Sequence, residues 1–359
     1  MDFAFSEEQK ALAASVRGFI EERFPIERVA EIADSDGGWD GAWWPEVSAL
    51  GWTGVSVPED AGGLGMGFLE EAIVLEETGR GLFPGPYFST VVLAMPALAS
   101  APDLVSDVVA GKRAATLANG EDDGAVTGGR DGEGWALNGP ATFVPDLAAA
   151  ELVVVAGRGP DGTCLWAVER DGPGAFWETL PTVDTTRRLG RLALSSAPGT
   201  LLAEGVEARA LLDRVRDQAL AGLAAEAVGV ASRALELAVG HAKSREQFGR
   251  PVGVYQAVSH RLADAFVETE SARSLVYWAA WAVANGTDEA PEAAAAAKAY
   301  AAEAAIAACE RAIQVHGGIG FTWEHPLHRY YKRALGIGAM FGWPAEQRAR
   351  VAASLLDES

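Results

Sequence analysis

A long alanine-rich run near the C-terminus limits most strongly how this chain can fold. Residues 292–313 are almost all strong helix formers, so they predict one long helix. The helix is expected to stop at Gly317 and Gly318, because consecutive glycines end helices and expose bare backbone. The amide of Gln314 stands just before this corner, and a second helical pattern follows Pro326. Spacing alone leaves two readings open, a corner that binds a polar ligand and a plain helix cap.

Composition narrows the class of protein. The chain has 359 residues, of which 49% are hydrophobic, which is enough for a large core and two or three domains. Its net charge of -21 argues against nucleic acid and anionic membranes as partners, because a basic patch supplies most of that affinity. Cys164 and Cys309 form no disulfide framework, and the N-terminus lacks the basic segment of a signal peptide. No apolar run reaches transmembrane length, so we expect a cytoplasmic protein.

Two patterns in the sequence argue against a phosphate-binding loop and against a metal site. Residues 57–65 (VPEDAGGLG) are rich in glycine, but they lack the lysine of a phosphate loop and follow no clear strand. The five histidines lie between positions 241 and 328, and none belongs to an HExxH or Cys/His pattern. No metal site is therefore expected.

The order of local patterns predicts an α+β fold. Residues 1–115 read as a helical N-terminal domain, which begins with a capping box at Ser6. In residues 116–205, short alternating runs separated by Gly, Pro and Asp indicate an antiparallel β-barrel or sandwich, and we take the barrel as the middle domain. Residues 206–359 return to long helical patterns joined by short loops, which predict a C-terminal four-helix bundle.

One helix of the N-terminal domain carries several acidic residues. Residues 68–79 form a helical pattern with glutamates at four positions, and we expect these side chains to form a solvated face. The four residues are Glu70, Glu71, Glu76 and Glu77.

A second polar cluster separates the first two helices of the bundle. Residues 245–251 read REQFGRP, which places Arg245 near Gly249 and Pro251. The planar guanidinium suits a phosphate group, although basic residues at a helix end also complement the helix dipole. Gln256 follows at the start of the next helix pattern, so an arginine, amides and glycines occur at two separate places, here and around Gln314.

Several segments together resemble the acyl-CoA dehydrogenase family. The two strongest are residues 245–264, with the pattern Arg-x-Gln-Phe-Gly-Arg-Pro followed by Tyr-Gln-Ala-Val, and residues 314–326 (QVHGGIGFTWEHP). Weaker likenesses occur in the expected order at residues 3–9, 57–65, 135–139 and 184–187, so the resemblance covers almost the whole chain.

The resemblance implies the same three-part fold and an activity. Members use FAD, and a glutamate removes the α proton of an acyl-CoA thioester while the β hydrogen passes to the flavin as hydride. The two carboxy-terminal motifs typically serve the pyrophosphate and AMP side of the FAD of a neighbouring subunit. The positions that carry this role here would be Arg245, Gln247, Phe248, Gln256, Gln314, Gly317 and Gly318.

The sequence departs from the family at the catalytic base. The usual glutamate position falls on Phe341, and the alternative position falls on Ala219. Neither side chain can accept a proton. Asp217 and Glu226 are the nearest substitutes, although roles on the helix surface would also explain both.

The middle domain departs as well. The family's flavin-side loop corresponds to residues 120–124 (GEDDG), whose three acids disfavour a bound phosphate or an anionic reduced flavin. The pair that covers the flavin ring system corresponds to Phe143 and Pro145. Phe143 keeps an aromatic stacking face, whereas Pro145 lacks both a hydroxyl and a backbone donor.

These departures suggest a subunit that completes the FAD site of a related partner, in a homo- or hetero-oligomer of dimeric or tetrameric form. The resemblance further implies an acyl-CoA substrate and an acceptor of the electron-transfer flavoprotein type. Two alternatives stay open: a self-sufficient homomeric dehydrogenase with a relocated base, and a non-catalytic flavin- or acyl-CoA-binding scaffold. The acyl group cannot be read from the sequence, so fatty and steroid side-chain thioesters both remain candidates.

Overall fold

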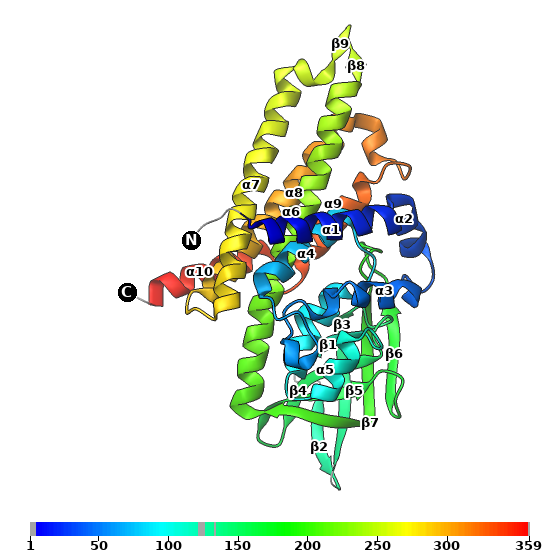
Figure 1. Ribbon diagram of the computed structural model, residues 1–359, viewed down its shortest axis with the longest axis vertical. Helices are drawn as coiled ribbons and strands as arrows, with labels where there is room; N and C mark the ends of the chain where they lie inside the picture. The colour runs from blue at the N-terminus through cyan, green and yellow to red at the C-terminus, as the bar shows by residue number, and fades with distance from the viewer. Residues whose placement is uncertain (1–4, 121–125, 133, 358–359) are drawn as a thin grey trace. The chain divides into compact units, whose positions relative to one another are not determined.

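The computed structural model describes residues 5–120, 126–132 and 134–357 (Figure 1). The chain divides into two compact units. Unit 1 comprises Met1–Ala30, Phe68–Phe83 and Leu220–Ser359, and unit 2 comprises Glu31–Gly67 and Pro84–Ala219. The ranges of two helices include residues of both units, namely α2 (Ile26–Asp34) and α6 (Gly205–Ser244).

Unit 1 is helical apart from one small hairpin. Its other elements are α1 (Glu7–Arg23), α4 (Phe68–Gly81), β8 (Glu246–Gln247), β9 (Arg250–Pro251), η6 (Val252–Val254), α7 (Gln256–Asn285), α8 (Ala290–His316), η7 (Gly317–Phe321), α9 (Leu327–Ala339) and α10 (Pro344–Asp357).

Unit 2 holds a sheet and short helices. Its helical elements are η1 (Gly41–Trp43), α3 (Trp44–Ala49), η2 (Trp52–Gly54), η3 (Glu59–Ala61), η4 (Phe88–Ala94), η5 (Met95–Leu98) and α5 (Pro102–Val109). Its strands are β1 (Ala115–Asn119), β2 (Thr127–Asp131), β3 (Gly134–Pro145), β4 (Leu152–Gly159), β5 (Gly162–Glu169), β6 (Ala175–Leu180) and β7 (Leu189–Glu204).

The strands of unit 2 close into a barrel. The neighbour order β4-β2-β3-β7-β5 returns to β4 through the β4–β5 pairing, so these five strands form a ring among the described residues. The predicted middle barrel is therefore confirmed. Most pairings are antiparallel, but β1 and β2 both run parallel to β4. The β2–β3 hairpin lies between β1 and β4 in the sequence and supplies the long connection that a parallel pair needs.

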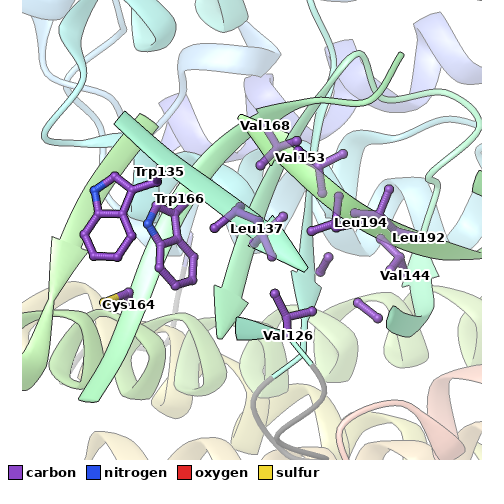
Figure 2. Close-up of a cluster of buried hydrophobic side chains, with 14 of the residues drawn as sticks. Val126, Trp135, Leu137, Val144, Val153, Cys164, Trp166, Val168, Leu192 and Leu194 are labelled. Carbon is purple, nitrogen blue, oxygen red and sulfur yellow. The ribbon is translucent and has the colours of Figure 1, made fainter. Parts of the chain in front are cut away.

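Alternating side chains fill the barrel with a dry core (Figure 2). Trp135 of β3 and Trp166 of β5 meet edge to face, with ring centroids 5.4 Å apart. Leu137 is fully buried beside them. At Gly128 of β2 a Cβ atom would stand 2.4 Å from the Trp166 ring, so only glycine leaves room for that indole.

The alanine-rich run forms α8 as predicted. This helix extends from Ala290 to His316 and ends at Gly317, whose φ of 65° lies in the region that favours glycine. Alanines line its buried positions, so α7 and the helices that follow α8 can pack closely against it. The predicted fourth bundle helix begins after Pro326 but breaks at residues 340–343, where Phe341 and Gly342 both have positive φ. A further helix, α10, follows this break.

Helices α4 and α6 touch through their backbones. A Cβ atom at Gly229 of α6 would lie 1.9 Å from the carbonyl oxygen of Glu76, and one at Gly79 of α4 would lie 2.2 Å from that of Glu226. The two glycines therefore allow the helices to pack closely. A side chain at either glycine would force the two helices apart.

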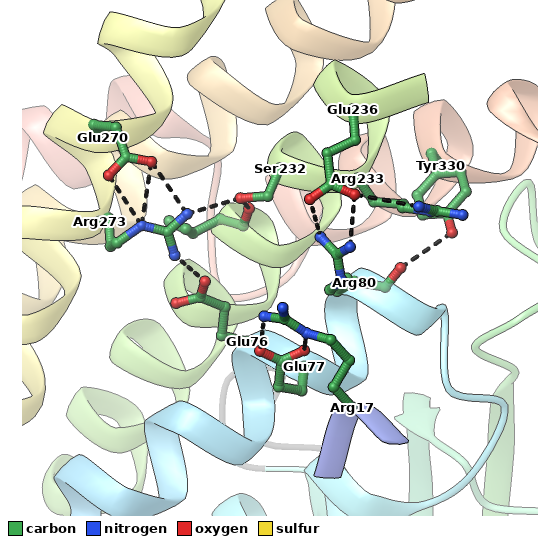
Figure 3. A network of polar contacts seen from close by, with 11 residues as sticks. Arg17, Glu76, Glu77, Arg80, Ser232, Arg233, Glu236, Glu270, Arg273 and Tyr330 are labelled. Atoms are coloured by element: carbon green, nitrogen blue, oxygen red, sulfur yellow. Dashed lines mark hydrogen bonds and ion pairs between the residues drawn. The ribbon is translucent and has the colours of Figure 1, made fainter. Parts of the chain in front are cut away.

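The predicted solvated face of α4 is wrong. Glu71, Glu76 and Glu77 are only 1%, 8% and 4% exposed. The prediction failed because cations from distant helices face α4. Arg273 of α7 donates to Glu76 (Figure 3). The hydroxyl of Tyr277, also on α7, donates to the same carboxylate at 2.7 Å. A helical pattern gives no sign of partners that lie some 200 positions away in the chain.

Further ion pairs continue this network (Figure 3). Arg17 of α1 donates to both carboxylate oxygens of Glu77, at 2.6 and 2.9 Å. Arg80 of α4 makes a two-point contact with Glu236 of α6, at 2.5 and 2.6 Å. The hydrogen bond to Glu77 raises the pKa of Arg17. Paired guanidinium forks thus fix α4 between α1 and the bundle within unit 1.

Candidate functional site

The connection between α6 and α7 forms a projecting hairpin. Helix α6 ends with the amide of Arg245 donating to the carbonyl of His241 at 2.8 Å. Strands β8 and β9 then pair through Gln247 and Arg250. Phe248 and Gly249 have φ values of 55° and 76°, so both turn residues are left-handed, as a tight two-residue hairpin requires. The Phe248 side chain is 93% exposed at the tip.

The start of α7 holds the hairpin in place. Tyr255, which caps α7, donates through its hydroxyl to the carbonyl of Gln247 at 3.2 Å. The Arg250 guanidinium lies 4.7 Å from the centre of the Tyr255 ring, within cation–π range. Gln256, the first residue of α7, is therefore fixed close behind the hairpin.

The end of α8 provides an open backbone corner. Gly317 needs to be glycine because of its positive φ, and Gly320 because a Cβ atom there would lie 2.8 Å from the carbonyl of Ile313. Gly318 has neither reason, since its φ is not positive and a Cβ atom would meet nothing within 4 Å in the described chain. A bare backbone at this point suits the close approach of a ligand.

Three histidine rings join the two motifs. His241 at the end of α6 stacks on His316 at the end of α8, with ring centroids 4.3 Å apart. His316 in turn lies 4.4 Å from His325, in the loop before α9. No sequence motif groups these three histidines. Two of them could have been noticed because they stand beside the motifs: His241 lies four residues before Arg245, and His316 lies two residues after Gln314.

The polar side chains of this bundle end are available for binding. Arg245, Gln256 and Gln314 are exposed, and no hydrogen bond or ion pair of their side chains occurs within the described ranges. Gln247 donates only to the adjacent carbonyl of Glu246, at 2.8 Å. An uncompensated guanidinium, free amides and an open glycine corner form a donor set that fits a pyrophosphate and its nucleoside.

Position 341 lies in a tightly held turn. Phe341 has a φ of 56°, and its carbonyl accepts from the Gln347 amide at 2.6 Å. Lys298, fully buried in α8, donates to the carbonyls of Gly338 and Gly342 at 3.2 and 3.3 Å. Burial lowers the pKa of Lys298 to about 8. The turn is therefore held through its backbone, and it presents a side chain that cannot act as a base.

The two substitute carboxylates occupy buried positions on α6. Asp217 is 9% exposed and Ala219 is fully buried, both in the part of α6 that belongs to unit 2. Glu226 belongs to unit 1 and is 2% exposed, and its Oε1 lies 4.0 Å from Nη1 of the buried Arg333. An ion pair accounts for the placement of Glu226 within unit 1.

In unit 2, Phe143 lies in a bulge of β3. The register with β7 shifts between Ala141 and Val144, and Phe143 takes a φ of 60° with 69% of its side chain exposed. Bulges of this kind commonly redirect a side chain beside a functional site. Pro145 supplies only its carbonyl, which accepts from the Thr116 hydroxyl at 2.6 Å. Of the acidic loop 120–124, residues 121–124 lie outside the described residues.

Neither a metal-binding cluster nor a membrane-spanning helix occurs in the described part of the chain. In the described part of the chain, no three or more His, Cys, Asp and Glu side chains are arranged to hold a metal ion. No described helix combines the length and apolar character needed to cross a membrane.

Comparison with known proteins identifies the fold and then the family. The helical N-terminal region, closed barrel and helical C-terminal region are those of the acyl-CoA dehydrogenase fold, as in butyryl-CoA dehydrogenase from Megasphaera elsdenii, which matches with a TM-score of 0.92 and 25% identity over 99% of this chain and 100% of that chain. Residues 217–356 match the family model of the acyl-CoA dehydrogenase C-terminal domain, and residues 6–101 match that of the N-terminal domain. The chain belongs to the acyl-CoA dehydrogenase family.

Individual relatives agree with this assignment. Acyl-CoA dehydrogenase IpdE2 of Mycolicibacterium smegmatis is 34% identical over 356 residues, which span 98% of this chain and 99% of the relative. The Tcur3481-Tcur3483 steroid ACAD, solved as a variant, matches with a TM-score of 0.89 and 34% identity over 98% of both chains. The ChsE4-ChsE5 complex from Mycobacterium tuberculosis matches with a TM-score of 0.90 and 30% identity over 99% of both chains.

The family assignment defines the class of chemistry. The chain is an oxidoreductase that acts on acyl-CoA, and members of its family are FAD-dependent flavoproteins. It also resembles subunits of heteromeric members of the family, since two of the matching structures are of two-component proteins.

Proposed function

We propose that this chain is a subunit of a heteromeric, FAD-dependent acyl-CoA dehydrogenase and that it completes the FAD site of a related partner subunit. In this proposal, Arg245, Gln256 and Gln314 bind the pyrophosphate and AMP half of the partner's cofactor. Gln247, Phe248 and the glycine corner complete that contact. A bound flavin would supply the hydride acceptor for the β hydrogen of the acyl-CoA, and a carboxylate of the partner would take the α proton.

The observation that carries the proposal is a contrast between the two sets of family positions. The positions that would serve a neighbour's cofactor keep their donors, and the side chains of Arg245, Gln256 and Gln314 are exposed and uncommitted in the described chain. The positions of the base hold Phe341 and Ala219, which have no group that can bind a proton. A chain that retains the cofactor-contact positions but lacks the catalytic base is suited to work with a related subunit that carries the base.

The environment of Glu226 also supports the proposal. A general base has to release and accept a proton near neutral pH. The carboxylate of Glu226 lies 4.0 Å from the guanidinium of the buried Arg333, in a site with almost no solvent access. This placement favours an ion-pair role for Glu226. Asp217 remains the candidate for the alternative, a self-sufficient homomeric dehydrogenase with a relocated base.

Co-expression tests the proposal. The chain is purified alone, and also together with a related acyl-CoA dehydrogenase subunit encoded beside it that carries the glutamate. We expect little flavin and no turnover for the isolated chain, and a full flavin complement and turnover for the complex. Flavin loading and turnover by the chain alone would overturn the proposal in favour of the homomeric enzyme. A complex that binds FAD but is never reduced by acyl-CoA would instead support the scaffold alternative.

For the substrate, we propose a steroid-derived acyl-CoA thioester. The support is the likeness to the Tcur3481-Tcur3483 steroid ACAD along nearly the whole chain. Anaerobic titration of the complex with a steroid side-chain thioester and with butyryl-CoA compares the two classes directly. Bleaching of the flavin only by butyryl-CoA would overturn the steroid assignment. An electron-transfer flavoprotein is the acceptor that we propose for the reduced complex.

A further inference from the structure

The loop between η7 and α9 is joined to the bundle by histidine side chains. We call His241, His316 and His325 the histidine clasp. The tilted contacts of these rings, with centroid separations of 4.3 and 4.4 Å, bring together α6, α8 and the loop that precedes α9. The clasp thereby holds the loop that follows the glycine corner against the ends of α6 and α8.

His325 also accepts a hydrogen bond from the first residue of α9. Its Nδ1 atom accepts a hydrogen bond of 3.3 Å from the backbone amide of Leu327, the first residue of α9. An imidazole nitrogen accepts only when it carries no proton, so this bond requires neutral His325. Protonation would turn Nδ1 into a donor directed at another donor, and it would add a positive charge where the helix dipole is already positive.

Among the described residues, the charged and titratable groups that act on the clasp are other histidines and an arginine, none of which carries a negative charge. His325 faces His316 and His241 and, from α9, His328, while His241 faces Arg245. The side chain of Glu324, the neighbour of His325 in the chain, is exposed to solvent. His316 is bound to α8 by a 2.8 Å contact between Nδ1 and the carbonyl of Ala312. Burial, followed by the nearby histidines, lowers the pKa of His325, and burial also lowers that of His241.

We propose that the histidine clasp is a pH-sensitive positioning device, which holds the loop from Gly317 to Pro326 closed while His325 is neutral and releases it when His325 is protonated. Because this loop begins with the glycine corner, its release weakens retention of the dinucleotide, a consequence that rests on the proposed function. The clasp itself requires only this chain.

The direction of the pH effect follows from linkage. A histidine whose pKa is lowered in the closed state binds a proton more readily in the open state. The closed state is therefore fully favoured above the ordinary histidine pKa of about 6.5 and is lost as the pH falls below it. Each unit by which the pKa is lowered corresponds to about a tenfold change in the opening equilibrium.

Hydrogen–deuterium exchange of the isolated full-length chain tests the clasp without flavin. Exchange of residues 317–327 is compared at pH 7.5 and pH 5.5, after correction for the intrinsic pH dependence of amide exchange. We expect at least several-fold faster corrected exchange at pH 5.5. His325→Asn supplies a side-chain oxygen that can accept from the amide two residues on, and it does not titrate. This variant should be protected equally at both pH values, whereas His325→Ala should exchange fast at both.

His260 provides a matched control, because it is an exposed histidine on α7 outside the clasp. His260→Asn should keep the pH response of the unaltered chain. Equal protection of the unaltered chain at both pH values would overturn the clasp, as would a pH response that persists in His325→Asn. If His325→Asn fails to fold, the His241→Asn chain is measured instead, and it should show a weaker pH response.

The complex tests the consequence for the cofactor. Flavin retention after gel filtration should fall several-fold between pH 7.5 and pH 5.5 in the unaltered complex, and should not fall with His325→Asn. Equal retention at both pH values by a complex whose loop opens would overturn the link to the cofactor. A complex without flavin at any pH would refute the proposed function, while the exchange of the isolated chain would still decide the clasp.

Discussion

Lys298 of α8 donates through Nζ to the carbonyl oxygen of Gly342, 3.3 Å away, in the turn that carries Phe341. The same ammonium group reaches Gly338 near the end of α9, where the carbonyls of a helix terminus attract a cation. Both contacts are made to backbone carbonyls, so they do not involve the side chain at position 341. The resemblance to the family predicts a catalytic glutamate at this position, where the chain carries phenylalanine.

The buried Lys298 predicts an alkaline rise in stability. Burial lowers its pKa from 10.5 to about 8, so the unfolded chain binds more protons between these pH values. The free energy of unfolding should therefore increase with pH across that window, by about 3 kcal/mol from this group. Lys298→Met should lack the increase. Urea denaturation at pH 8 and pH 10 measures it, with the exposed Lys243→Met as control. Identical pH dependence in the two variants would contradict the prediction.

The contact of α4 with α6 predicts that a side chain at position 229 strongly lowers the free energy of unfolding. Gly229→Ala places a methyl group 1.9 Å from the carbonyl oxygen of Glu76, and a backbone atom cannot move aside cheaply. We expect a loss of about 1–3 kcal/mol or more in the free energy of unfolding. Gly240→Ala on the same helix is the matched control, because nothing lies within 4 Å of its Cβ position. That variant should gain up to about 1 kcal/mol from helix propensity. Similar stabilities for the two variants would show that the helices do not touch as described.

The ion pair of Glu226 with Arg333 predicts that Glu226 stabilises the folded chain and is not the catalytic base. Glu226→Gln leaves a buried guanidinium without its carboxylate at 4.0 Å, which should cost about 3–5 kcal/mol. Adding Arg333→Met to this variant should recover part of the loss. Thermal and urea denaturation measure both steps. A Glu226→Gln chain of unchanged stability whose complex has lost turnover but kept flavin would instead identify Glu226 as the base.

The uncommitted guanidinium of Arg245 predicts a selective effect on the cofactor. Loss of a charge-assisted hydrogen bond to phosphate is worth about 1.5–3 kcal/mol, so Arg245→Met should weaken FAD binding by the complex about 10- to 100-fold. The stability of the isolated chain should hardly change, because the Arg245 side chain makes no hydrogen bond or ion pair within the described residues. Lys243→Met removes an equal charge two residues away and should have a much smaller effect. Fluorescence titration of the deflavinated complexes with FAD provides the comparison, and equal losses would contradict a specific role.

Local patterns in the sequence were reliable where the physical cause is itself local. The capping box at Ser6, the stop of α8 at Gly317 and the barrel strands each depend on backbone preferences or on alternating burial within one segment, and the structure confirms them. The two motifs around Arg245 and Gln314 could be noticed for a similar reason, since helix ends, glycines and amides can be read from neighbouring residues. Their role in binding the cofactor stays a prediction.

Contacts between distant segments were not readable. The glutamates of α4 look like a solvated face until the folded chain brings Arg17 and Arg273 against them. The histidine clasp joins residues of three separate elements that no motif connects, and the close approach at Gly229 depends on where α4 lies. In each case the energy comes from a partner that folding supplies.

The sequence by itself determined the family, the succession of helical and β regions and the absence of a glutamate at position 341, because these properties belong to residue identity and local spacing. Only the tertiary structure decided that Glu76 and Glu77 of α4 are buried in ion pairs, that Lys298 holds the turn of Phe341 and that His325 accepts a hydrogen bond from the first amide of α9. Burial and charge pairing depend on distances between segments, and those distances exist only once the chain has folded.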